Sequence, residues 1–85
     1  MTAGSLRDAV GHALAGRWDA AHDIAQAHEG EPLADWLHAV LHKIEGDAGN
    51  ARYWYHRAGR MDHVADDATA ELSAITAAVD ERRPP

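Results

Sequence analysis

The fold is specified most clearly by residues 32–46, PLADWLHAVLHKIEG. Apolar residues recur there at i, i+3, i+4, i+7, i+8 and i+11, which is the period of a helix with one buried stripe. The stripe consists of Leu33, Trp36, Leu37, Val40, Leu41 and Ile44. Pro32 suits a first helical turn and Gly46 suits a helix end. The pattern predicts a helix over residues 32–45, with its histidines facing away from the buried stripe.

The same helical period recurs between the other turn glycines. It predicts helices over about residues 5–15, 18–28 and 48–58, and a last helix from Met61 to about Asp80. Alanine dominates the apolar residues, Phe is absent, and Val and Ile are few, which disfavours strands. Because the connecting loops are short, neighbouring helices must run antiparallel. We therefore expect an all-α fold of four to five helices, a single domain over residues 1–80, and a frayed tail at 81–85.

Size and composition exclude several functional classes. A chain of 85 residues makes one domain, and the absence of Cys removes disulfides, zinc fingers and thiol catalysis. Eight Lys and Arg against fourteen Asp and Glu give a net charge of −6, which argues against nucleic acid as a partner. Neither a signal peptide nor a membrane span is evident, so we expect a cytoplasmic protein without a membrane partner.

Residues 46–58, GDAGNARYWYHRA, resemble the turn and second helix of a tetratricopeptide repeat. That family places Gly-Asp at the turn and then a small residue, an aromatic and another small residue, which Ala51, Tyr55 and Ala58 match. Ala39 stands where the preceding helix of such a repeat carries a small residue. The resemblance implies tetratricopeptide-like hairpins with a C-terminal capping helix, and a non-enzymatic, adaptor-like role in binding a protein or peptide.

The first hairpin matches the repeat less well. Gly16 and Ala21 fit, but Ala25 replaces the aromatic and His28 replaces the last small residue. The two turns are thirty residues apart instead of the thirty-four of a regular array. Residues 36–59 also resemble small bacterial proteins of unassigned function, which implies kinship without chemistry.

The second hairpin carries the expected partner-binding surface, which consists of Asn50, Arg52, Tyr53, His56 and Arg57. Three consecutive aromatics, residues 53–55, point about 100° apart on a helix, so they cannot all face one core. We expect Tyr53 at the surface, whereas Trp36, Trp54 and Tyr55 fill the core. The basic cluster favours a partner that carries carboxylates. Two hairpins bury little surface, so homodimerisation would supply further burial.

A different hypothesis is a metal site. His38, His42 and Glu45 share one face of the third predicted helix, in a His-x3-His-x2-Glu pattern. Two His one turn apart beside a carboxylate can hold a divalent metal such as Zn²⁺, with a metal-dependent hydrolase as the corresponding enzyme. His22, Asp47 and His56 are candidates to complete the ligand set. The pattern is not the zincin order of ligands.

A purely structural interpretation treats the same groups as an internal hydrogen-bond network. A buried neutral His22 would pair with Glu45 or Asp47, and Asp47 would cap the fourth predicted helix. Nucleophilic catalysis has no support, because Ser5 and Ser73 lie in no strand-turn-helix elbow and no Gly-rich phosphate loop exists. The sequence therefore predicts a protein that is not an enzyme and that needs no cofactor, unless the histidine face binds a metal.

Overall fold

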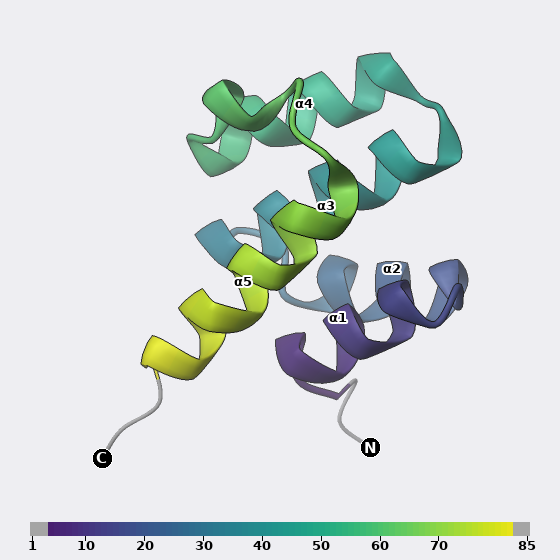
Figure 1. The fold of residues 1–85 in the computed structure, drawn as a ribbon, viewed down its shortest axis with the longest axis vertical. Helices are drawn as coiled ribbons and strands as arrows, with labels where there is room; N and C mark the ends of the chain where they lie inside the picture. The colour runs from purple at the N-terminus through teal and green to yellow at the C-terminus, as the bar shows by residue number, and fades with distance from the viewer. Residues whose placement is uncertain (1–3, 83–85) are drawn as a thin grey trace.

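A computed structural model gives the structure of the chain and describes residues 4–82, except for the side chain of Arg82 (Figure 1). The elements are α1 (Leu6–Leu14), α2 (Trp18–Ala27), α3 (Pro32–Glu45), α4 (Ala48–Ala58), the 3-10 helix η1 (Met61–His63) and α5 (Ala68–Arg82). Residues 4–82 contain no β-strand. The all-α prediction is confirmed, with five α-helices.

Local signals set the ends of the helices. Ser5 caps α1 through a capping box, in which the Asp8 backbone N–H donates to Ser5 Oγ (3.1 Å) and the Ser5 N–H donates to Asp8 Oδ2 (3.2 Å). Helices α3 and α4 end at Gly46 and Gly59, whose φ angles of 86° and 69° lie in the left-handed region that favours glycine. The predicted bounds 32–45 and 48–58 are confirmed.

Helix α3 is the centre of the molecule. It forms an antiparallel hairpin with α4 and also packs against α2, α5 and α1 (Figure 1). As a result, the ten consecutive residues from Leu33 to His42 are all buried. Ala34 and Ala39 are fully buried, and their small side chains let neighbouring helices approach α3 closely. The sequence predicts one buried stripe on this helix, whereas the structure covers every face of it from Leu33 to His42.

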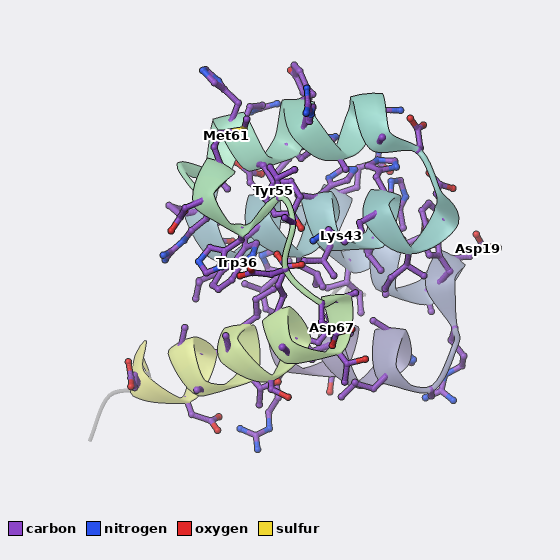
Figure 2. The ribbon with its side chains drawn as sticks, turned by 45° about the horizontal axis from the view of Figure 1, so that its top comes forward. Asp19, Trp36, Lys43, Tyr55, Met61 and Asp67 are labelled. Carbon is purple, nitrogen blue, oxygen red and sulfur yellow. The ribbon has the colours of Figure 1, made fainter. Side chains whose placement is uncertain are left out.

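A buried carboxylate attaches α5 to the α3–α4 hairpin. Glu71, 2% exposed, accepts hydrogen bonds from Trp36 Nε1 (3.1 Å), from the Tyr55 hydroxyl (2.7 and 2.9 Å) and from Lys43 Nζ (2.6 Å). Figure 2 shows Trp36, Lys43 and Tyr55 between α4 and the start of α5. Burial, and then the hydrogen bond to Glu71, raises the pKa of Tyr55 well above its usual value. The hydroxyl therefore stays protonated and donates to the carboxylate.

The last helix starts later than the sequence pattern predicts. A continuous stripe from Met61 is wrong, because η1 and a turn occupy residues 61–67 and Met61 is 47% exposed. Lys43 Nζ holds this turn by donating to the backbone carbonyls of His63 (3.1 Å) and Asp66 (2.7 Å). Asp67 lies directly before α5 and accepts a hydrogen bond from the backbone N–H of Ala70 (3.0 Å). These hydrogen bonds hold residues 61–67 in a turn, so that α5 begins at Ala68.

Two residues that the stripes place inside are exposed. Leu14 is 56% exposed and Ile44 is 47% exposed, because each lies in the last turn of its helix, beyond the neighbours that cover the middle. Single exposed apolar side chains are normal on small proteins.

Helix α5 packs along both α3 and α1, so it contacts both hairpins. An exposed ion pair between Arg7 and Asp80 links α1 to α5. Helix α5 continues through Glu81 and Arg82, and residues 83–85 of the predicted tail lie outside the described residues. Within residues 4–82, every helix is too short or too polar to cross a membrane. The radius of gyration of 11.6 Å matches the value of about 12 Å expected for one compact domain of this length.

We expect removal of Glu71 to be among the most destabilising changes in the chain. Glu71→Ala leaves the Lys43 ammonium, the Trp36 N–H and the Tyr55 hydroxyl without their buried acceptor, at a cost of about 3–5 kcal/mol. Tyr55→Phe, which removes one donor, should cost about 1–2 kcal/mol. Urea unfolding followed by circular dichroism measures both values. Glu81→Ala, on an exposed part of α5, is the control and should change stability by less than about 0.5 kcal/mol.

Candidate functional site

Three histidines converge between α2 and α3. His22 lies on α2, and His38 and His42 lie one turn apart on α3. One ring nitrogen of each lies within 4.8 Å of the other two. The Nε2 atoms of His22 and His38 are 3.0 Å apart and share a hydrogen bond. We call these three residues the histidine cluster.

Two tryptophans enclose the histidine cluster. The Trp18 ring stacks on His22 with centroids 4.7 Å apart, and the Trp54 ring stacks on His38 at 3.7 Å. Trp18 is held in place because its Nε1 donates to the backbone carbonyl of Leu41 (2.7 Å). The stacked indole rings thus cover one face of the His22 ring and one face of the His38 ring. Trp54 is buried in the core as predicted, and it also forms a wall of this site.

Burial at the cluster overturns one expectation. The sequence pattern turns His38 and His42 away from the core, but they are only 3% and 8% exposed, while His22 is half-buried. The reason is the central position of α3, since α2 and α4 cover the side of the helix that the apolar stripe leaves open. His22 pairs with His38 instead of the predicted Glu45 or Asp47.

His38 is the most strongly perturbed member of the cluster. Burial, followed by the nearby His22 and His42, lowers its pKa from 6.5 to about 4, because each of these disfavours the charged imidazolium. The ring is therefore neutral at pH 7. Its Nδ1 atom is buried and has no hydrogen-bond partner. An unsatisfied buried polar atom costs about 1–3 kcal/mol, so the cluster is incomplete as a hydrogen-bond network.

Glu45 orients His42. Its Oε1 atom lies 2.6 Å from His42 Nδ1, and because a carboxylate only accepts, Nδ1 carries the proton. In the neutral ring with this tautomer, the Nε2 atom carries a lone pair. Metal-binding histidines commonly have such a carboxylate behind the ring. The predicted set His38, His42 and Glu45 is not brought together as three ligands, because the group that contains His38 is completed by His22.

A second group of potential ligands adjoins the first at His42. One atom each from His42, Glu45 and Asp47 lies within 4.8 Å of the others. Asp47 is the N-cap of α4 as predicted, with Oδ1 accepting from the Asn50 N–H (3.2 Å) and Oδ2 from the Asn50 side chain (2.8 Å). These hydrogen bonds from Asn50 hold the pKa of Asp47 below its usual value. Both acids are exposed and already have partners, so we treat them as neighbours of the histidine cluster.

All five predicted partner-binding residues are exposed, with Tyr53 at 54%. The Tyr53 hydroxyl accepts a hydrogen bond from Arg57 (3.4 Å). Asn50 is already bonded to Asp47. Arg57 pairs with Glu29 on the first hairpin (2.8 Å), and its guanidinium lies 4.7 Å from the centre of the Trp54 ring. The ion pair raises the pKa of Arg57 above its usual value.

Three important polar residues escape prediction from the sequence. Glu71 stands three residues after Ala68 and four before Ile75, so a carboxylate on the apolar face of the last helix was the available signal. Lys43, its partner, shows no such signal, since a lysine in a last helical turn is ordinary. Trp18 stands four residues before His22 on the same helix, so this i, i+4 spacing was the available signal for the contact of the two rings.

Comparison with protein-family models, with curated proteins and with solved structures finds no match to this chain. A function is therefore inferred from the side-chain arrangement itself. That arrangement consists of two buried imidazoles and one half-buried imidazole, with one carboxylate that orients a ring. It suits metal coordination better than acid–base or nucleophilic chemistry.

The lowered pKa of His38 predicts that the fold loses stability in mild acid. Unfolding raises the pKa of this group from about 4 to 6.5, so below pH 6.5 the unfolded state binds a proton that the folded state rejects. The contribution is fully present above pH 6.5 and is lost as the pH falls toward 4. Between pH 7 and pH 5 it amounts to about 2 kcal/mol.

Urea unfolding in the presence of a chelator at pH 7 and pH 5 checks this expectation. His38→Leu, which keeps an apolar side chain of similar size and does not titrate, should reduce the pH-dependent loss by about 2 kcal/mol. His56→Leu is the matched control, because His56 is exposed on α4, and it should behave as the natural chain does. An unchanged pH dependence in His38→Leu would contradict the prediction.

Proposed function

We propose that the protein binds one divalent transition-metal ion, with Zn²⁺ as the representative case, through His22, His38 and His42. The observation that carries the proposal is the convergence of three imidazole nitrogens from two helices within 4.8 Å. Imidazole nitrogen is a preferred ligand of Zn²⁺, Cu²⁺ and Ni²⁺, whereas Ca²⁺ and Mg²⁺ require oxygen. The metal class follows from the ligand type.

The distances support a site that needs only small side-chain adjustments. In a tetrahedral zinc site, ligand nitrogens at 2.0–2.1 Å from the ion are about 3.3 Å from one another. The His22 and His38 nitrogens are 3.0 Å apart, and no pair in the cluster exceeds 4.8 Å. The largest required shift is therefore about 1.5 Å, which rotation of the rings can supply.

The protonation states also support the proposal. A metal competes with protons for imidazole, so a histidine that is neutral at pH 7 is a better ligand. The pKa of His38, near 4, meets this requirement, and Glu45 presents the Nε2 lone pair of His42. A metal would also replace the hydrogen bond between His22 and His38 with two coordinate bonds. The site would then connect α2 and α3 more firmly than the hydrogen bond does.

Three protein ligands leave a coordination position for water, as in catalytic zinc sites. Because of this open position, metal-dependent hydrolysis is the enzymatic activity that the proposed site would support. Glu45 and Asp47, which lie beside His42, are the nearest groups that could accept a proton from such a water. Metal binding is the part of the proposal that the ligand geometry supports directly.

We also infer a tetratricopeptide-like character for the second hairpin. It is supported by the left-handed Gly46 at the turn, by buried Ala39 and Ala51 between α3 and α4, and by buried Tyr55. Helix α5 does not extend this likeness, because it packs along α3 and α1 and contacts both hairpins instead of covering the end of the second. The inferred likeness is limited to residues 32–59.

Zinc titration of chelator-treated protein tests the metal proposal. We expect one ion per chain by elemental analysis after dialysis, and a rise in the thermal unfolding temperature as the site fills. His22→Ala should weaken binding by at least about 100-fold, since loss of a direct ligand exceeds the 10–100-fold typical of an outer-shell residue. His56→Ala, an exposed histidine on the same molecule, is the control and should bind as the natural chain does.

Glu45→Gln separates this ligand set from the one that the sequence suggests. If Glu45 only orients His42, binding should fall by about 10–100-fold with the stoichiometry unchanged. Circular dichroism of the metal-free variants establishes that each one is folded. No bound metal in the natural chain, or equal affinity in His22→Ala, would refute the proposal and leave the cluster as an internal hydrogen-bond network.

A further inference from the structure

A second set of metal-binding groups adjoins the histidine cluster. One donor atom each from His42, Glu45 and Asp47 lies within 4.8 Å of the other two, and we call these three residues the outer set. Its carboxylates lie at the last residue of α3 and at the N-cap of α4, where they reach solvent, whereas His42 is only 8% exposed. Because His42 belongs to both sets, one ring connects the solvent-facing donors to the buried ones.

The histidine cluster itself is poorly accessible to a hydrated ion. Its two members on α3 are buried, and the indole ring of Trp54 covers one face of His38. Moving a charged ion into such a site is costly unless protein groups replace its water. Oxygen donors at the edge of the site would replace part of the hydration shell before the ion reaches the imidazoles.

The outer set has the charge and the free capacity for this step. Hydrogen bonds from Asn50 hold the pKa of Asp47 below its usual value, so this carboxylate is negative at pH 7. The bonds from Asn50 and from His42 use only part of each carboxylate, since a carboxylate offers about four acceptor positions. In a chain of net charge −6, these acids attract a cation to the edge of the cluster.

The other point at which the cluster reaches solvent is His22, which is half-buried. Asp19 and Asp23 stand near it on α2 and are exposed. Within residues 4–82, however, neither acid joins His22 in a set of three close donor atoms. The outer set is better placed to transfer an ion, because it contains a ring of the cluster.

We infer that the outer set is the entry site of the metal ion, where Glu45 and Asp47 capture a hydrated divalent cation that then passes by His42 into the histidine cluster. The inference rests on the proposed metal site and adds the route by which that site fills. The His42 ring keeps its proton on Nδ1, and its Nε2 atom receives the ion. Afterwards the two carboxylates are again bonded only to His42 and Asn50.

Stopped-flow mixing of the metal-free chain with Zn²⁺ tests the inference. Tryptophan fluorescence reports uptake, since two of the proposed ligands stack on indole rings. Asp47→Asn removes one carboxylate but keeps the helix cap, because Asn caps as well as Asp. We expect the association and dissociation rate constants both to fall about 10-fold at low salt. The Kd, from competition with a chromogenic chelator, should stay nearly unchanged, because a group that holds the ion only in passage alters both rates alike.

Two controls carry the same change in charge. Asp67→Asn alters the residue that caps α5, outside the outer set, and should take up zinc at the natural rate. Asp19→Asn examines the route at His22 and should also leave the rate unchanged. Salt should slow the natural chain toward the rate of Asp47→Asn, because it screens the exposed acids.

Mn²⁺ examines the outer set without the histidine cluster, because this ion prefers carboxylate oxygens. In His22→Ala, Mn²⁺ should broaden the backbone amide NMR signals of residues 45–48. Adding Asp47→Asn to that variant should remove the broadening. Absence of broadening in His22→Ala would overturn the inference.

The rate measurements separate this inference from the proposed function. Uptake at the natural rate by Asp47→Asn, or slower uptake in Asp19→Asn or Asp67→Asn, overturns the entry site and leaves the metal site in place. Faster dissociation with unchanged association also overturns it, because Asp47 would then hold the ion in its final position. A natural chain that binds no zinc refutes the proposed function, and this inference with it.

Discussion

The complete burial of α3 from Leu33 to His42 is the constraint on which the rest of the structure depends. A helix that is covered on every face cannot send its polar side chains to water, so each one must find a partner inside the protein or carry an energetic cost. Asp35 accepts a hydrogen bond from the backbone N–H of Gly30, and His38 pairs with His22. His42 is bonded to Glu45 just beyond the buried segment. These contacts fix the position of α2 and of the loop between α2 and α3.

The two buried polar groups on either side of α3 differ in how completely they are satisfied. Around Glu71, both carboxylate oxygens are used, as are the Trp36 N–H, the Tyr55 hydroxyl and the Lys43 ammonium. Such a closed network explains why α5 docks where it does, and it needs no ligand. In the histidine cluster, by contrast, His38 keeps a buried nitrogen without a partner and the Nε2 atom of His42 carries a lone pair. The histidine cluster is therefore the buried polar group whose unpaired ring nitrogens could bind a metal ion.

Much of the local structure was predictable from the sequence, because it depends on local signals. The period of residues 32–45, the glycines that end α3 and α4, and the Asp47 cap all act over a few residues. The polar interior was not predictable in the same way. A periodic pattern identifies the most apolar side of a helix, but it does not reveal that other helices will cover the remaining sides. For that reason His38 and His42 appeared solvent-facing, and the sequence left open whether Glu45 is a metal ligand or a member of a hydrogen-bond network.

X-ray absorption at the zinc edge of the loaded protein tests the account most directly, because it reports the atoms around the ion and not only the affinity. Coordination by the histidine cluster predicts three nitrogens at about 2.0–2.1 Å with the outer-shell scattering of imidazole rings, reduced to two rings in His22→Ala. A shell of carboxylate and water oxygens without imidazole scattering, or a spectrum that His22→Ala leaves unchanged, would contradict it.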